Sequence, residues 1–371
     1  MVLLYYLYLW NILLKVLKLN NMKKLLLLIA LMGIASGIFA QVSKTVNVEA
    51  AGTLSPSLTS NELATITNLT ITGTIDAHDF VTIREDMPLL AVLNLSGVTI
   101  AAYTGTLGTS TSRNDYPTDA IPDYAFHNSI THIGKISLTT IVFPSSLSSI
   151  GIYAFASCKR LTTATIPSSV STIGEYAFVY CNGLTTVTIP SSVTSIERYT
   201  FSQCSGLTTV TIPSSVTSIG ANAFWLCSGL TTVTIPSSVT SIRQEAFVGC
   251  RGLITVDSNN PNYSSLDGVL YDKSQTALIQ CPTSKIGSFM IPSSVTSIGT
   301  AAFNWCRELT TVTIPSSVIS IGEYAFINCN GLTSITTSRI TPINLSTSYG
   351  VFDSFKTTCT LYVPSWFKEC L

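Results

Sequence analysis

The chain has 371 residues, of which only 10% are charged, and its 19 basic residues balance its 19 acidic residues. Soluble domains usually carry about 25% charged residues, so Ser and Thr supply much of the polar surface here. The segment 1–40 holds four lysines and no acidic residue, which leaves a net charge of −4 on residues 41–371. Because nucleic-acid binding depends on clustered Lys and Arg, this composition excludes it as a main function.

Residues 1–40 have the pattern of an N-terminal extension followed by a signal peptide. Met22-Lys23-Lys24 is a positive start, residues 25–32 are apolar, and residues 33–40 are mostly small. We interpret residues 1–21 as the result of a start codon assigned too early. We predict cleavage after Ala40 and export of the protein. No run of about 18 apolar residues follows, so we expect no membrane span in the mature chain.

A repeat of 23 residues makes up the body of the chain. The phrase IPSSV occurs six times, and a Phe followed three residues later by Cys recurs in step with it. The marker pairs are Phe155/Cys158, Phe178/Cys181, Phe201/Cys204, Phe224/Cys227, Phe247/Cys250, Phe303/Cys306 and Phe326/Cys329. Such self-similarity predicts a solenoid in which each unit buries its apolar face against its neighbours.

The first half of each unit is predicted to be a strand and a corner. Residues 184–189 (LTTVTI) are rich in β-branched side chains, and we expect Leu184, Val187 and Ile189 to point inward. Pro190 ends this strand. A second short edge would then return to the core through Val193 and Ile196.

The second half of each unit is predicted to be one helical or 3-10 turn, with the Ala, Phe and Cys of AFxxC facing inward. Glycine follows most of these turns, and we expect a left-handed backbone there. The glycines are Gly183, Gly206, Gly229, Gly252 and Gly331.

These phrases resemble the BspA-like leucine-rich repeats of secreted and surface bacterial proteins, over residues 121–340. The resemblance implies a right-handed leucine-rich-repeat solenoid, mainly parallel β, with short helical or 3-10 turns on its convex side. Residues 253–290 break the period and resemble a variant coil of the family, and Asp267-Gly268 predicts a hairpin turn within it.

The ends of the chain differ from the regular repeats. We interpret residues 41–120 as an N-terminal cap with irregular leucine-rich coils, in which residues 104–119 form a surface loop. Residues 341–371 are interpreted as a C-terminal cap.

Seven of the ten cysteines share one repeat position. In parallel coils their Cβ atoms would be too far apart for ordinary disulfides, so we expect buried free thiols that act as small apolar groups. Some bridging stays an alternative, including a bridge between Cys359 and Cys370. A row with one cysteine per coil does not provide the tetrahedral ligand set of a zinc site.

Catalysis has little support in the sequence. The three histidines, His78, His127 and His132, belong to no nucleophile, zinc or phosphate-loop motif. Glu175, Glu197, Glu245 and Glu323 fall at or near one repeat position, so repetition explains them. We therefore expect no catalytic residue, no metal and no cofactor.

Two outward files of Thr run along the predicted strands. Their members include Thr186 and Thr188, Thr209 and Thr211, and Thr232 and Thr234. Thr is a good exposed strand residue, which explains the files most simply. A remote alternative is ice binding, because regular Thr-x-Thr files order water in some β-solenoids.

Positions that vary between units are candidates for ligand contact, because aromatic residues and Arg are favoured at interfaces. Packing along the convex edge is the alternative role for the aromatic members. These candidates are Tyr180, Trp225, Trp305, Arg198, Arg243, Arg251 and Arg307.

The resemblance implies a protein, secreted from or displayed on a bacterial cell, that presents its repeat surface to an extracellular protein or polysaccharide. We expect a monomer without nucleic-acid partners. The alternative is a catalytic or accessory component of extracellular glycan processing, which would need paired carboxylates in a cleft.

Overall fold

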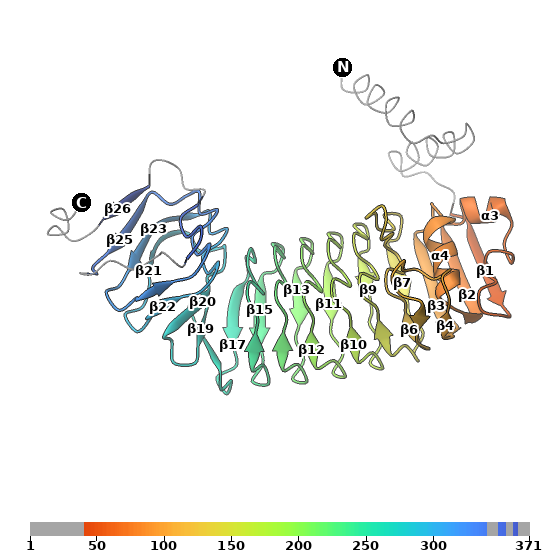
Figure 1. Ribbon diagram of the computed structural model, residues 1–371, viewed down its shortest axis with the longest axis horizontal. Helices are drawn as coiled ribbons and strands as arrows, with labels where there is room; N and C mark the ends of the chain where they lie inside the picture. Colours follow the sequence, from red (N-terminus) through yellow and green to blue (C-terminus); the bar gives the residue numbers. More distant parts are fainter. Residues whose placement is uncertain (1–40, 340–347, 354–358, 363–371) are drawn as a thin grey trace, which may run out of the picture.

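The computed structural model describes residues 41–339, 348–353 and 359–362. These residues wind into a long stack of coils, as Figure 1 shows, with parallel pairing between successive coils. The predicted solenoid fold is therefore confirmed. The predicted signal peptide, its cleavage site at Ala40 and Cys370 all lie outside the described residues.

The first coils carry helices on the side opposite their strands. Strands β1 (Ser43–Val48), β2 (Asn68–Ile75) and β3 (Val92–Ile100) pair in parallel, and the helices are α3 (Ser60–Thr65) and α4 (Ala77–Glu85). Both helices begin with a capping box, formed by Thr59 with Glu62 and by Asp76 with Asp79. Neither helix is long enough or apolar enough to cross a membrane, and the described residues contain no other helix.

Residues 104–119 lie mostly on the surface, as predicted for a loop, but they also contain ordered structure. Strands β4 (Tyr103–Thr104) and β5 (Asp115–Tyr116) form a small antiparallel hairpin. Tyr116 of β5 is buried, and Arg113 pairs with Asp123 of the first regular coil at 2.7 Å. The segment is thus tied to the solenoid.

Each regular coil contributes one short strand to each of two sides. The first side holds β7 (Thr140–Val142), β9 (Thr163–Ala164), β11 (Thr186–Thr188), β13 (Thr209–Thr211), β15 (Thr232–Ile235) and β17 (Leu253–Val256). The second side holds β6 (Ala120–Ile121), β8 (Ser149–Ile150), β10 (Thr172–Ile173), β12 (Ser195–Ile196), β14 (Ser218–Ile219) and β16 (Ser241–Ile242). The AFxxC segments close the third side.

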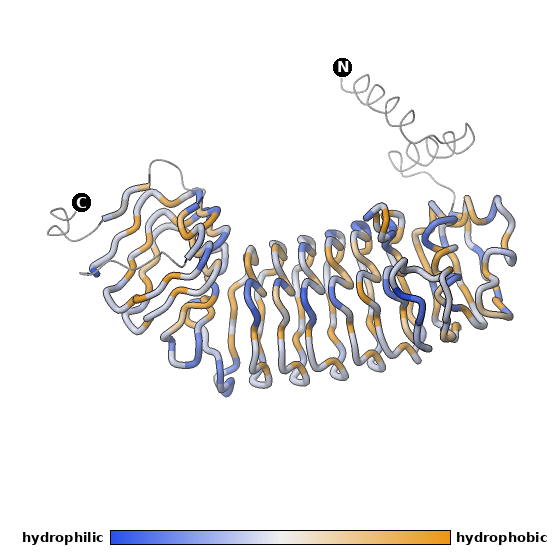
Figure 2. Tube along the Cα trace, viewed as in Figure 1, coloured by the Kyte–Doolittle hydropathy of each residue, from blue (hydrophilic) through white to orange (hydrophobic). Residues whose placement is uncertain are grey.

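The interior follows the repeat consensus. Leu184, Val187, Ile189, Val193 and Ile196 are all buried, as predicted. The marker Phe rings stack from coil to coil with centroids 4.8–5.6 Å apart between Phe126 and Phe247. Hydrophobic segments accordingly recur in every coil of Figure 2. This continuous apolar column stabilises coils that could not fold alone.

The predicted helical or 3-10 turn is wrong in its local geometry. The AFxxC segments form consecutive β-turns, in which Tyr176 and Tyr180, for example, have φ of 58° and 61°. Their alternate N–H groups bond to the next coil, such as Phe155 N to Ala177 O at 2.8 Å. A helix would use these donors internally, so hydrogen bonding between coils selects the turns instead.

The prediction for the repeat glycines is also wrong. None of the five has positive φ. Instead, a Cβ on Gly206 would lie 2.3 Å from the carbonyl oxygen of Asn182 in the preceding coil, and one on Gly331 would lie 2.1 Å from that of Arg307. Glycine is present here because the coils approach too closely for a side chain.

The variant unit contains the predicted hairpin. Strands β18 (Tyr263–Leu266) and β19 (Val269–Asp272) pair antiparallel across Asp267-Gly268, where both residues have positive φ. Side chains of β19 alternate between two cores: Leu270 packs into the N-terminal one, and Val269 and Tyr271 into the C-terminal one. The hairpin therefore separates the two cores.

The C-terminal coils form a second stack, which is tilted against the first in Figure 1. One sheet continues from the hairpin through β20 (Ala277–Gln280), β22 (Ser297–Ile298) and β24 (Ser320–Ile321). The other contains β21 (Gly287–Met290), β23 (Leu309–Ile314), β25 (Ser334–Thr337) and β26 (Thr360–Tyr362).

Candidate binding face

The third side of the solenoid, which we call the turn face, presents the variable positions of the repeat. In each regular AFxxC turn the Phe and Cys are buried. The residue before Ala-Phe and the residue before Cys face outward, both with positive φ in most coils, as Tyr176 and Tyr180 show. The repeat therefore keeps its inner residues constant and varies an outer row.

Four tyrosines form a continuous stack on this face. The ring centroids of Tyr124, Tyr153, Tyr176 and Tyr199 lie 5.1, 4.4 and 4.7 Å apart in order. The Arg198 guanidinium lies 5.0 Å from the Tyr199 ring centroid and 5.8 Å from that of Tyr176. The pKa of Tyr153 is raised to about 12, mainly because the side chain is buried and secondly because Tyr176 lies beside it. The Tyr153 hydroxyl therefore stays protonated at ordinary pH.

A groove of about 300 Å³, which we call the tyrosine groove, runs along the stack from Tyr153 to Tyr199 and continues past Asn222 to Glu245. Tyr180 and Trp225 supply its other aromatic walls. Its polar groups include Gln203, Asn222 and Glu245, and Asn222 donates to the Glu245 carboxylate at 3.2 Å. Aromatic walls with a few amide and carboxylate groups are typical of ligand sites.

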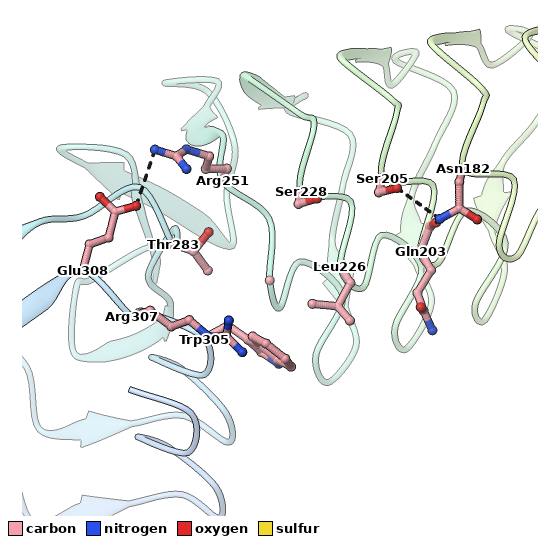
Figure 3. Close-up of a pocket in the computed structure, with 11 residues that line it drawn as sticks. Asn182, Gln203, Ser205, Leu226, Ser228, Arg251, Thr283, Trp305, Arg307 and Glu308 are labelled. Atoms are coloured by element: carbon pink, nitrogen blue, oxygen red, sulfur yellow. Dashed lines mark hydrogen bonds and ion pairs between the residues drawn. The ribbon is translucent and has the colours of Figure 1, made fainter. Parts of the chain in front are cut away.

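A second recess, which we call the notch, interrupts the turn face where the two stacks meet (Figure 3). It encloses about 440 Å³ between Leu226 and Trp305, whose side chains point toward one another. The notch exists because the variant unit has no AFxxC turn between Cys250 and Cys306. Its lining residues are Asn182, Gln203, Ser205, Leu226, Ser228, Gly249, Arg251, Thr283, Trp305, Arg307 and Glu308.

Three charged side chains border the notch. Arg251 and Glu308 form an ion pair at 3.5 Å, with side chains that are 60% and 49% exposed. The guanidinium of Arg307 lies 4.1 Å from the ring centroid of Trp305, close enough for a cation–π interaction. The polar groups on the opposite wall include Asn182, which donates to the Ser205 hydroxyl at 3.1 Å.

The structure divides the predicted contact residues among these features. Tyr180 and Trp225 line the tyrosine groove, Trp305 lines the notch, and Arg198 covers the tyrosine stack. Arg243 is exposed and lines neither recess. The predicted aromatic residues thus lie in two recesses. Of the predicted arginines, Arg251 and Arg307 line the notch, whereas Arg198 and Arg243 line neither recess.

The predicted Thr residues lie on a different side, the Thr face. All six are exposed, and Thr186 pairs in register with Thr209, as Thr188 does with Thr211. Thr232 and Thr234 follow in β15. This side is uniform and contributes no residue to either recess. Whether any predicted contact residue binds a ligand stays a prediction.

Sequence reasoning missed most of the residues that shape the recesses. Tyr124, Tyr153, Tyr176 and Tyr199 share a repeat position, so this stack had a visible signal. Gly249, Thr283 and Glu308 had none, because they become neighbours only through the irregular variant coil. Cys281 was also missed: it is buried beside Cys306, off the 23-residue step.

The titratable groups of the described residues form no metal-type cluster of His, Cys, Asp and Glu. The nine described cysteines carry free thiols, and burial raises the pKa of Cys158, Cys204, Cys250 and Cys329 to about 12. His127 is buried, bonds through Nδ1 to Ala156 O at 3.1 Å, and has a pKa lowered by that burial. The alternative of a bridge between Cys359 and Cys370 cannot be compared with the structure, because Cys370 lies outside the described residues.

Stacked parallel coils with a 23-residue period and a variable outer row define a leucine-rich-repeat solenoid. The model of the BspA type leucine-rich repeat region matches residues 119–254 and 280–365, with six copies. This match covers more than half of the chain, so the protein belongs to the BspA-type leucine-rich repeat family. The unmatched residues between the two ranges contain the β18–β19 hairpin.

Three solved structures of bacterial proteins illustrate what this chain is similar to. A leucine-rich cell surface protein from Faecalibacterium prausnitzii is 37% identical, over 60% of this chain and 65% of that one, with a TM-score of 0.49. A leucine-rich repeat protein from Eubacterium ventriosum is 22% identical over 76% and 62%, with a TM-score of 0.40. The pneumococcal vaccine antigen PcpA is 20% identical over 80% and 69%, with a TM-score of 0.43.

The chain thus spans less than two thirds of the length of the first two of these proteins. No curated protein matches the chain.

Proposed function

We propose that this protein is a non-enzymatic binding protein that is exported and either secreted or displayed on the bacterial cell surface. It holds an extracellular protein or polysaccharide on its turn face. The observation that carries this proposal is the pair of adjacent recesses, which both use Gln203 and are lined by positions that vary between coils. A preformed surface of this kind limits the entropy lost on binding.

Export is the second element of the proposal. Its support is the signal-type pattern of residues 22–40, together with the location of the Faecalibacterium relative, which is a cell surface protein. We extend that location to this chain as part of the same proposal.

Catalysis on a glycan is less well supported by the geometry of the recesses. The tyrosine groove is lined by one carboxylate, Glu245, and the notch by one, Glu308. Glycosidases generally use two carboxylates about 5–9.5 Å apart. A binding role therefore fits both recesses better than hydrolysis.

The test is a screen of the purified protein against glycan and matrix-protein arrays, followed by two matched double variants. Tyr180→Ala/Trp225→Ala changes the turn face, and Thr186→Ala/Thr209→Ala changes the Thr face. We expect the first to weaken binding of the selected ligand at least tenfold and the second to leave it unchanged, because aromatic side chains dominate binding energy at interfaces. The reverse pattern, or turnover of the ligand, would overturn the proposal.

A further inference from the structure

The notch has a shape that the regular repeat cannot produce. In the regular coils, the residue before each Cys belongs to the outer row, and three successive coils place Tyr180, Gln203 and Leu226 there. The next coil has Gly249 at this position, and the variant unit that follows contributes Thr283 from a segment without an outward turn. The outer row resumes only at Trp305. The notch is therefore a bounded recess of about 440 Å³, within the usual size of sites for small ligands.

Glu308 is present because the same irregularity removes a steric restriction. Glu308 is two residues after Cys306, at the repeat position that glycine occupies in the regular coils (Gly183, Gly206 and Gly229). In those coils a side chain would collide with the preceding coil. The variant unit does not place a regular turn against it, so the position accepts a charged residue. The charged groups of the notch are thus specific to this junction.

The charge of the notch favours an anionic ligand. Its lining contains two arginines, Arg251 and Arg307, and one carboxylate, Glu308, although residues 41–371 as a whole carry a net charge of −4. The Arg251–Glu308 pair is long and largely exposed, and such pairs contribute little to stability. A ligand carboxylate can therefore take the place of Glu308 and form a bidentate contact with Arg251.

The remaining lining groups suit a sugar better than a peptide. Asn182, Gln203, Ser205, Ser228 and Thr283 offer amides and hydroxyls that can exchange hydrogen bonds with several ligand hydroxyls. An indole offers an apolar surface for the C–H face of a sugar ring, and the Trp305 indole, which is in contact with the Arg307 guanidinium, points across the recess toward Leu226 (Figure 3).

The backbone on this face argues against binding of an extended peptide. The N–H of Leu226 already bonds to Val248 O at 2.7 Å, and that of Gln203 bonds to Trp225 O at 2.6 Å. A peptide that adds to a sheet needs a free strand edge, and these groups are consumed between coils.

We propose that the notch binds an acidic oligosaccharide, with a uronic-acid carboxylate on Arg251 and a neighbouring sugar ring on Trp305. This inference rests on the proposed function and specifies its ligand class. It also separates two roles on one face, because the tyrosine groove has no arginine in its lining and would hold neutral parts of the same glycan.

Calorimetric titration with defined probes tests the inference. The acidic probes are tetragalacturonic acid, a guluronic acid tetramer and a hyaluronan tetrasaccharide; the neutral probe is galactotetraose, and the peptide probe is an acidic tetrapeptide ending in Trp. We expect at least one acidic tetramer to bind at least tenfold more tightly than galactotetraose. We also expect this affinity to fall as NaCl increases, since partly exposed charges are screened.

Three variants locate the site. Trp305→Ala and Arg251→Gln should each weaken binding of the acidic tetramer at least tenfold, and Arg243→Gln, which changes an exposed arginine outside both recesses, should not. The exposed position of Arg251 makes misfolding of that variant an implausible cause of any loss, and circular dichroism checks Trp305→Ala. Three results would overturn the inference: no acidic tetramer binds, Trp305→Ala and Arg251→Gln leave binding unchanged, or only the peptide binds. If array ligands still depend on Tyr180 and Trp225 in those cases, the proposed function stands and only the notch assignment fails.

Discussion

The thiol of Cys204 lies 3.1 Å from the backbone carbonyl oxygen of Phe178, 26 residues earlier and one coil away, and donates a hydrogen bond to it. The same link recurs along the first stack, in the pairs Cys181–Phe155, Cys227–Phe201 and Cys250–Phe224, at 3.0–3.1 Å. The cysteine row is therefore more than a set of small apolar groups. It connects successive turns of the solenoid through directional bonds.

This link predicts unequal costs for the same substitution at two buried cysteines. Cys306 occupies the repeat position of Cys204, but its thiol lies 3.7 and 3.8 Å from its acceptors. Both sites lose the same volume on change to Ala, so the difference isolates the hydrogen bond. We expect Cys204→Ala to lower the free energy of unfolding by about 1 kcal/mol more than Cys306→Ala. Urea denaturation measures both values, and equal losses would contradict the inferred role of the thiol.

The buried thiols should make the protein unreactive to thiol reagents while it is folded. Burial raises the pKa of Cys204 from its ordinary value of 9.0 to about 12, so at pH 8 the nucleophilic thiolate is rare. In a Cys359→Ser/Cys370→Ser variant, we expect almost no labelling by Ellman's reagent in buffer and eight labelled thiols in denaturant, because ten cysteines are present in the chain. Rapid labelling of the folded variant would show that the coils open readily.

The same pKa shift predicts a sensitivity to alkali. A thiol whose pKa is higher when folded favours the folded state fully below its unfolded pKa of about 9, and this contribution is lost as pH rises toward 12. Several cysteines shift in this direction, so their losses add. We expect the urea midpoint to fall steeply above pH 9. A double variant, Cys204→Ala/Cys227→Ala, should show a shallower fall over the same range; an identical slope would assign the alkaline loss to other groups.

A single methyl group should disrupt the close approach of two coils. Gly206→Ala would place Cβ 2.3 Å from Asn182 O, so the coils must separate, and overpacking of this kind costs about 1–3 kcal/mol. Arg160 occupies the same repeat position in the coil of Phe155 and Cys158 and is exposed. Arg160→Ala is therefore a matched control that should change stability by less than about 0.5 kcal/mol. Equal thermal midpoints for Gly206→Ala and the natural protein would refute the steric explanation.

The sequence predicted the features that depend only on the period. The inward residues Leu184 and Val187, the stacked Phe column and the hairpin at Asp267-Gly268 follow from spacing and local turn chemistry. The turn geometry could not be predicted in this way. Tyr176, Tyr180 and their equivalents have positive φ because alternate N–H groups reach the next coil, which is a property of the stack and not of one segment.

The candidate site was predictable only in part. Trp225 and Trp305 stood out as variable aromatic residues, and both line recesses. The notch itself results from an absent turn, and no residue pattern in the sequence indicates the recess that this absence creates. Arg251 and Glu308 are 57 positions apart, and the fold of the variant coil brings them together.

The Thr face offers a final prediction, concerning the ice-binding alternative. An ice surface would require long, flat and continuous Thr files. In the described coils β11 pairs with β13 and β15 with β17, but no ladder joins β13 to β15, so the sheet is interrupted between Thr211 and Thr234. We therefore expect the purified protein to show no thermal hysteresis at high concentration, measured by nanolitre osmometry. Hysteresis that is present in the natural protein and lost in Thr209→Ala/Thr211→Ala would contradict this expectation and would move the functional surface from the turn face to the Thr face.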